Sequence, residues 1–367
     1  MPLEALMPGY VAYSPALEMI GEDEHETVEG LKEQFGHILD TTLADYGRGV
    51  RSVHAKGHAI ARGRFVVTEG LPSELAQGLF AKPGEYEAVF RISTNPGDIL
   101  DDAISVPRGM ALKVLGVEGE RLPGSEREAT QDFVMANAPA FAAKDAKAFL
   151  GNLKLLAKTT DKAEGAKKLF SAALQGLEAG LEKLGTESGL LKTLGGAPQV
   201  HPLGATYFSQ TPYRFGDHVA KFQLRPVSPD LLALVGERID VKGRRDAIRE
   251  DTGAALAQHG GVWELRVQLC TDAEAMPIED ATVVWDEEAS PYRTVARLEI
   301  DPQPGWSGAH EALDEALSFR PWHGLAAHRP LGNINRARNE TYRFSADTRR
   351  RANGCPLHEP TALAEIA

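Results

Sequence analysis

The chain has few of the features that mark a membrane-spanning or disulfide-rich protein. Its 367 residues include two cysteines, Cys270 and Cys355, which are too few for a disulfide framework or for a zinc site of paired cysteine motifs. No run of about 20 apolar residues is present, and the first residues lack the basic start and apolar stretch of a secretory signal. We therefore expect a cytoplasmic protein with no membrane partner.

Positive charge is also in short supply. The chain has 40 Lys and Arg residues against 52 Asp and Glu residues, a net charge of −12. Binding to nucleic acid or to an anionic lipid surface needs the opposite balance, so we expect neither partner. Because 43% of the residues are hydrophobic and 25% are charged, the composition is that of an ordinary globular protein, and we expect it to handle a small molecule.

Common nucleotide and metal motifs are missing as well. We find no phosphate-binding loop of the Gly-x4-Gly-Lys-Ser type and no Gly-x-Gly-x-x-Gly after a strand. His323 and His328 lie five residues apart with His310 upstream, but this spacing does not place two ligands on one helix face. We interpret these histidines as surface or hydrogen-bonded residues.

The order of the expected elements indicates an α+β fold. A helix is expected at 26–46, short strands dominate residues 53–117, and a helical stretch at 140–192 carries an apolar repeat at Leu174, Leu177, Leu181 and Leu184. Further strands and two closing helices are then expected at 219–225, 263–269, 282–285, 294–300, 310–318 and 335–350. Strands, a helical insert, strands and helices form an α+β order rather than a βαβ alternation.

Two short stretches carry candidate chemistry: Arg51 to His58, which opens the strand region, and Arg336 to Arg349 near the C-terminus. In the strand at 87–93, Ala88, Phe90 and Ile92 share one face, whereas Arg91 and Ser93 share the other. In the helix near the C-terminus, Arg338, Tyr342 and Arg349 fall on one side. A tyrosine normally ionises near pH 10, so a phenolate at neutral pH needs a metal ion or a cationic neighbour. The spacing alone fits equally well with a cation–π pair on a helix surface.

Five motifs taken in order resemble the haem catalase superfamily. They are Val53-His54-Ala55-Lys56-Gly57 preceded by Arg51, Arg91-Ile92-Ser93-Thr94, Ser105-Val106-Pro107-Arg108-Gly109, Met135-Ala136-Asn137-Ala138-Pro139 and Arg338-Asn339-Glu340-Thr341-Tyr342. The stretch from Ala312 to Pro321 adds to the resemblance, which runs from about residue 51 to residue 350 and is faint through the helical insert.

The resemblance implies a catalytic set on one side of a haem. His54 would be the distal base that moves a proton between the two peroxide oxygens, and Ser93 would hold its other ring nitrogen. Asn137 would donate a hydrogen bond to the peroxide. Tyr342 would ligate the ferric iron from the opposite side, with Arg338 next to its oxygen.

The resemblance also implies contacts that hold haem b in place. Arg51, Arg91 and Arg349 would pair with the two propionates, because buried carboxylates need partners and arginine pairs with them in a fork. Val53 and Phe141 occupy positions where the family contacts the cofactor or its pocket. Strand alternation independently places Arg91 and Ser93 on one face.

The fold implied is a catalase-like antiparallel β-barrel with surrounding helices and a C-terminal helix that carries the haem ligand. We expect an N-terminal arm and helix at 1–50, a haem-binding core at 51–352 with a helical insert at about 142–193, and a tail at 353–367. A homo-oligomer, with a dimer as the working assumption, is expected.

Two departures from the family pattern favour peroxidase activity. Val106 stands where the family has a channel aspartate, and Ala142 follows Phe141 where the family has a second phenylalanine. A less polar and wider channel would admit organic peroxides, reduced with electrons from a small organic donor, with weak catalase activity beside it. Two alternatives stay open: rearrangement of fatty-acid hydroperoxides, as in the related allene oxide synthases, and a non-enzymatic haem carrier or sensor. Val53 argues against the synthases, in which a threonine precedes the distal histidine.

Overall fold

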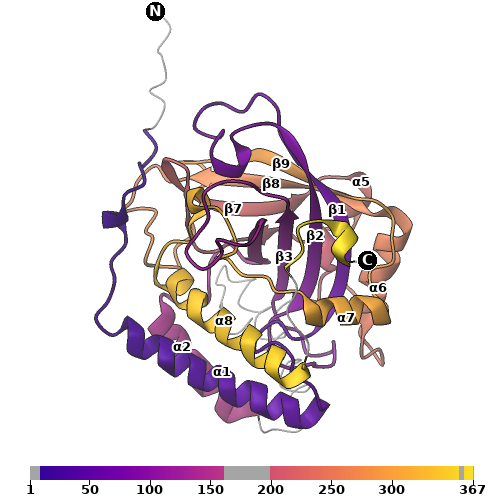
Figure 1. Cartoon of the computed structure of the whole chain (residues 1–367). Coiled ribbons are helices and arrows are strands. Elements are labelled where there is room, and N and C mark those ends of the chain that lie inside the picture. Colours follow the sequence, from indigo (N-terminus) through magenta and orange to yellow (C-terminus); the bar gives the residue numbers. More distant parts are fainter. Residues whose placement is uncertain (1–8, 161–198, 355–358, 367) are drawn as a thin grey trace, which may run out of the picture.

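A closed antiparallel barrel forms the centre of the molecule, and helices pack around it (Figure 1). The structure is a computed structural model and describes residues 9–160, 199–354 and 359–366. The strands are β1 (Gly57–Val67), β2 (Gly84–Thr94), β3 (Arg108–Leu115), β4 (Thr130–Ala136), β5 (Tyr207–Phe208), β6 (Tyr213–Phe215), β7 (His218–Pro226), β8 (Gly261–Leu269) and β9 (Arg293–Ile300). The α-helices are α1 (Glu24–Tyr46), α2 (Ala146–Thr160), α5 (Pro229–Ala233), α6 (Ala247–His259), α7 (Gly308–Ala316) and α8 (Asn333–Asn353), and short 3-10 helices η1 (Pro15–Leu17), η2 (Gly78–Phe80), η3 (Pro202–Gly204), η4 (Ala326–His328) and η5 (Leu363–Ile366) lie between or after them.

Eight strands close the barrel in the order β1-β2-β3-β4-β5-β7-β8-β9, and β9 pairs back to β1. The short strand β5 makes the closure, because Phe208 pairs with Ala136 of β4 on one side and with Gln223 of β7 on the other. Strand β6 extends the sheet beyond β7. The expected α+β fold built on an antiparallel barrel is confirmed.

Strand alternation sends apolar side chains into the barrel and polar ones outward on β2. Ala88, Phe90 and Ile92 lie in the large apolar core, whereas Arg91 and Ser93 face away from it. All five are buried, because other elements cover the outside of the barrel at this point. The barrel wall therefore has a second buried side, where polar groups can be held at fixed positions.

Helices α1, α2 and α8 form the layer that covers this outer side (Figure 1). Val28, Leu31, Phe35 and Leu39 repeat at three and four residues along α1 and are buried, as an amphipathic helix requires. Arg336 in the first turn of α8 pairs with three glutamates, Glu18, Glu24 and Glu279. This four-residue cluster links α8 to the N-terminal segment and to the loop before β9.

Two expectations have a different outcome. The strand expected at 282–285 is wrong: this segment is irregular, and Trp285 packs in a small apolar cluster without a partner strand. The apolar repeat from Leu174 to Leu184 lies outside the described residues.

Within the described ranges, no helix has the length and apolar character needed to cross a bilayer. In the same parts of the chain, no group of three or more His, Cys, Asp or Glu side chains is arranged to hold a metal ion. His328 is buried among Phe80, Phe215 and Phe222, and its Nε2 accepts a hydrogen bond from the Leu79 N–H at 2.9 Å. It is a hydrogen-bonded core histidine.

Candidate active site

A cavity lies between the outer face of the barrel and helix α8. The space that it encloses is about 660 Å³, part of which is open to solvent. Strands β2, β3 and β4 provide one wall, α8 and the segment before it provide the other, and Phe35 of α1 closes one part. The lining is Phe35, Arg51, Ser52, Val53, His54, Arg91, Ser93, Gly109, Met110, Ala111, Val134, Met135, Ser318, Phe319, Arg320, Thr341, Tyr342, Ser345, Ala346 and Arg349.

Seven residues expected from the sequence line this one cavity, although they come from distant parts of the chain. They are Arg51, Val53, His54, Arg91, Ser93, Tyr342 and Arg349. The other three expected site residues, Asn137, Phe141 and Arg338, do not line it.

The backbone of His54 is held in a sparsely populated conformation. Its φ is 55°, in the left-handed region that non-glycine residues rarely adopt. Two hydrogen bonds hold the His54 backbone in this conformation. The His54 N–H donates to the Asn95 carbonyl at 2.7 Å, and Arg91 Nη2 donates to the His54 carbonyl at 2.9 Å. Strain that the surroundings maintain in this way is typical of functional positions.

The His54 ring is oriented from two sides. Its Nδ1 lies 3.1 Å from Ser93 Oγ. It also packs directly against Gly109, where a Cβ would overlap Nδ1 and Cε1 of the ring. Burial, reinforced by the charges of Arg91, Arg338 and Arg51, lowers the pKa of His54 to about 3, so the imidazole is neutral near pH 7.

Three arginines gather at one end of the cavity around the carboxylate of Asp314. Arg91 binds it with two nitrogens, at 2.6 and 3.1 Å, and Arg51 Nη1 lies 2.7 Å from it. Arg51 and Arg349 also donate to the Leu317 carbonyl, each at 2.9 Å. The cluster of Arg51, Arg91, Arg349 and Asp314, called the arginine cluster below, is buried except for Arg51, which is partly exposed, and it has two positive charges in excess.

The three expected residues outside the lining have other contacts. Arg338 lies one helical turn from Tyr342 on α8, and its Nη1 donates to Asn335 Oδ1 at 3.1 Å and to Thr211 Oγ1 at 3.3 Å. Phe141 packs beneath the Arg338 guanidinium, and the distance from Arg338 Cζ to the centre of the Phe141 ring is 5.6 Å. Asn137 directly follows β4, and its Oδ1 accepts the Arg108 N–H at 2.8 Å.

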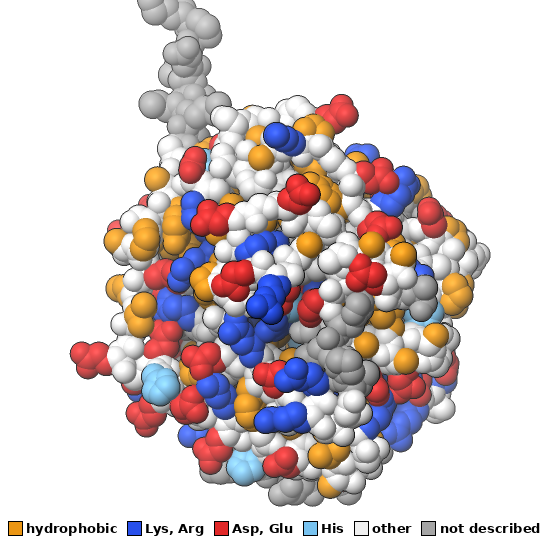
Figure 2. All heavy atoms as spheres, viewed as in Figure 1, with side chains coloured by type: hydrophobic (Ala, Val, Ile, Leu, Met, Phe, Trp, Pro, Cys, Tyr) orange, Lys and Arg blue, Asp and Glu red, His pale blue; other side chains and the backbone are white. Residues whose placement is uncertain are grey.

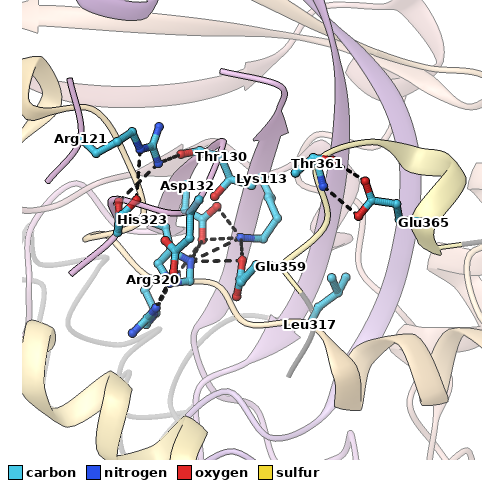
Figure 3. A network of polar contacts seen from close by, with 12 residues as sticks. Lys113, Arg121, Thr130, Asp132, Leu317, Arg320, His323, Glu359, Thr361 and Glu365 are labelled. Carbon is cyan, nitrogen blue, oxygen red and sulfur yellow. Dashed lines mark hydrogen bonds and ion pairs between the residues drawn. The ribbon is translucent and has the colours of Figure 1, made fainter. Parts of the chain in front are cut away.

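A second buried charged group borders the cavity, and Figure 3 shows it from close by. Lys113 Nζ is 2.8 Å from Asp132 and 2.7 Å from Glu359, and it lies 5.6 Å from the centre of the Phe319 ring, which lines the cavity. His323 lies within 3.2 Å of Asp132, and Arg320, another lining residue, contacts both His323 and Glu128. The lysine cluster is defined as Lys113, Arg121, Glu128, Asp132, Arg320, His323 and Glu359.

Sequence reasoning missed Asp314 and the whole lysine cluster. Asp314 stands in the stretch before α8 that contributed to the family resemblance, yet nothing in its neighbours along the chain indicates ion pairs with two arginines, Arg51 and Arg91. Lys113 and Asp132 face each other in the β3–β4 ladder, a pairing that follows only once the register is known.

The molecular surface on the side of α7 and α8 has mixed charge. Figure 2 shows Lys and Arg side chains gathered near the middle of this face, with Asp and Glu side chains between them.

The comparisons with known proteins give a structural match and no sequence match. No protein-family model matches the sequence, and no curated protein does. Among solved structures, catalase A from Saccharomyces cerevisiae matches with a TM-score of 0.58 and 20% identity, over 85% of this chain and 64% of that chain. A fungal catalase matches with a TM-score of 0.56 and 18% identity, over 87% of this chain and 65% of that one.

This chain thus spans slightly less than two thirds of the length of either catalase. Both matches cover most of this chain, and both matched proteins are catalases. The chain has the catalase-like fold of the superfamily that its motifs resemble.

Proposed function

We propose that the protein is a haem-dependent enzyme that breaks down peroxides, acting mainly as a peroxidase, organic peroxides included, with weak catalase activity. The observation that carries this proposal is the meeting of His54, Tyr342 and the arginine cluster around one cavity. The catalase-like fold supports it at the level of the superfamily.

The residues present fit a haem in three respects. The arginine cluster has two positive charges more than it has carboxylates, and a haem has two propionates. The Arg349 Nε is buried without a hydrogen-bond partner, as expected of a donor that pairs with a bound ligand. Tyr342, whose phenolate oxygen is a known type of haem-iron ligand, lines the same cavity as His54.

In this proposal, Tyr342 holds the haem iron from the α8 side, and Arg51, Arg91 and Arg349 hold the propionates. The bound haem would supply the redox-active iron that peroxide cleavage needs. Val53 and the apolar lining of the cavity would exclude water and favour peroxides with hydrocarbon substituents.

His54 would move the proton. Because its pKa is lowered to about 3, it is neutral and can accept a proton at Nε2 over the physiological range. If Nδ1–H donates to Ser93 Oγ, Nε2 is left as the acceptor. His54 then takes the proton from one peroxide oxygen and delivers it to the other, which leaves as water or an alcohol.

Three other residues have proposed roles that differ in their structural support. Arg338 would act next to Tyr342 from its place one turn earlier on α8. Phe141 would act indirectly, because it packs on Arg338 instead of the cavity. Asn137 has its Oδ1 engaged by Arg108, so only its Nδ2 could donate to a peroxide. Val106 is buried outside the cavity lining, so its effect on a channel is not supported by this geometry.

The experiment is a comparison of peroxide reactions in the haem-loaded wild type and in H54A. Oxygen release from hydrogen peroxide measures catalase activity, and oxidation of a phenolic donor with an alkyl hydroperoxide measures peroxidase activity. We expect donor oxidation to dominate and H54A to slow it by about 100- to 10,000-fold while haem remains bound. The proposal would be contradicted if H54A reacted at the wild-type rate, or if the haem-loaded wild type reacted with neither peroxide.

A variant that keeps the His54 side chain tests the orientation of its ring. In G109A the new Cβ overlaps the ring, so the imidazole must move although its chemistry is unchanged. We expect the peroxide rate to fall while haem affinity stays close to that of the wild type. The control is A111G on the same strand, which removes one methyl group from another residue that lines the cavity.

A further inference from the structure

Asp314 is the carboxylate around which the arginines of the cavity are arranged. It is on α7, is 6% exposed and has ion pairs with Arg51 and Arg91. Its backbone carbonyl accepts a further bond from Arg51 Nη2 at 2.5 Å. The contact with Arg91 uses both carboxylate oxygens, the paired geometry in which arginine binds carboxylates most strongly.

Asp314 approaches the arginines from the side away from the cavity. It lines a second, smaller hollow of about 380 Å³, together with Arg48, Glu311 and Glu315, and it does not line the cavity itself. Arg51 and Arg349 line both spaces. All three arginines therefore line the cavity, whereas their counter-ion Asp314 does not.

The charges of the cluster do not balance. Burial, followed by repulsion from Arg91, lowers the pKa of Arg51 well below its ordinary value, and burial lowers that of Arg349 to about 10. For Asp314, burial acts to raise the pKa, but the charges of Arg51 and Arg91 outweigh it and hold the pKa well below its usual value. Arginine side chains keep their proton in proteins, so repulsion among the three cations opposes the assembly of the cluster.

We infer that Asp314 is a positioning residue, a built-in counter-ion that keeps the arginine cluster assembled before a cofactor binds, so that the cluster accepts a ligand with two carboxylates. Without Asp314, three cations would stand together in a buried place with no negative charge. When the ligand binds, its two carboxylates neutralise the remaining charge from the cavity side. This inference rests on the proposed function, because it takes a porphyrin dicarboxylate as the ligand.

The test measures how the ligand compensates for the loss of Asp314. D314N keeps the shape of the side chain and removes its charge. Thermal unfolding is followed for the full-length chain without ligand, with metal-free protoporphyrin IX, and with protoporphyrin IX dimethyl ester, which has the same ring and no carboxylates. We expect D314N to lower the Tm of the ligand-free chain by roughly 5–10 °C, and to lower that of the protoporphyrin complex by less than half as much. The diester should give no such recovery.

The matched control is E315Q, one residue further along α7. Glu315 pairs with Arg48 at the partly exposed edge of the outer hollow and has no contact with the other three arginines in the described structure. E315Q should shift all three states by the same small amount. A merely structural role of Asp314 in seating α7 would likewise lower the free and the loaded states equally, and that result would overturn the inference.

The wild-type chain offers a measurement that does not depend on whether D314N folds. Protoporphyrin IX should bind at least about tenfold more tightly than its dimethyl ester, since only the dicarboxylate meets the excess charge. Equal affinities overturn the inference on Asp314 and leave the proposed function in place. If neither porphyrin binds, the result contradicts both the inference on Asp314 and the proposed function.

Discussion

Two buried charged clusters lie on the outer side of the same barrel wall, and they differ in charge balance. In the lysine cluster, the charges of Lys113, Arg121 and Arg320 face those of Glu128, Asp132 and Glu359, so cations and carboxylates are equal in number. In the arginine cluster, three cations face the single carboxylate of Asp314.

This difference separates a cluster that is complete within the chain from one that is not. A buried ion pair with all partners present holds segments in register, although it adds little net stability over an apolar replacement. A cluster with unmatched charge carries a cost that a ligand of opposite charge can relieve, and buried, perturbed groups of this kind gather at functional sites. The lysine cluster borders the cavity, and we propose that the arginine cluster provides the contacts for a ligand.

The largest effect is expected from breaking the balanced cluster. K113M removes a fully buried cation and leaves Asp132 and Glu359 without their partner. Losing one member of a buried pair costs about 3–5 kcal/mol, so the free energy of unfolding from denaturant titration should fall by that amount.

The control for K113M is R64M, on strand β1. Arg64 also pairs with glutamates across strands, but half of its side chain is exposed to water. We expect R64M to change the free energy of unfolding by less than about 1 kcal/mol. Equal effects of the two variants would show that burial of the lysine cluster has no energetic consequence.

The opposite pattern is expected in the arginine cluster. R349M removes a buried cation whose Nε has no partner and which has no ion pair with Asp314 among the described contacts. Because no carboxylate is stranded, the free energy of unfolding of the ligand-free chain should change by no more than about 1 kcal/mol. The affinity for protoporphyrin IX, measured by fluorescence titration, should fall by about 10- to 100-fold, as the loss of one charged hydrogen bond implies.

The smallest effect concerns the pH dependence of the lysine cluster. Burial raises the pKa of Glu128 from 4.5 to about 7. Between these two values the folded chain keeps the Glu128 proton whereas the unfolded chain has lost it, so this group lowers stability as the pH rises through that window. The slope is at most about 1.4 kcal/mol per pH unit and smaller for a side chain that water partly reaches. E128Q cannot titrate, so the difference in unfolding free energy between wild type and E128Q should change with pH from 4.5 to 7 and level off above 7.

The sequence predicted those parts of the site that depend on local geometry. The two-residue period of a strand placed Arg91 and Ser93 together, and the structure puts both in the cavity wall. The helical period placed Tyr342 and Arg349 on one side of α8, and both line the cavity. In each case the relation holds within one element and needs no knowledge of how the elements pack.

The parts that it did not predict depend on distant segments meeting. Asp314 reaches Arg91 across 223 positions of the chain, and Glu359 reaches Lys113 across 246. Those contacts exist only because the barrel closes and the later segments fold back over β2 and β3. The sequence resemblance assigned Asn137 a hydrogen bond to the peroxide, but only the register of β4 against β3 shows that its Oδ1 is engaged by the backbone of Arg108. Residues 282–285 look like a strand because of their composition, yet they are irregular, and Trp285 packs in a small apolar cluster.

The most direct test of the central claim is a titration of the purified full-length protein with haemin, followed by visible absorption, in wild type and in Y342F. We predict saturable binding of one haemin per chain with a tyrosinate-type ferric spectrum in the wild type, and a changed spectrum with weaker binding in Y342F. Absence of saturable binding, or identical spectra in the two proteins, would contradict a haem held between Tyr342 and His54.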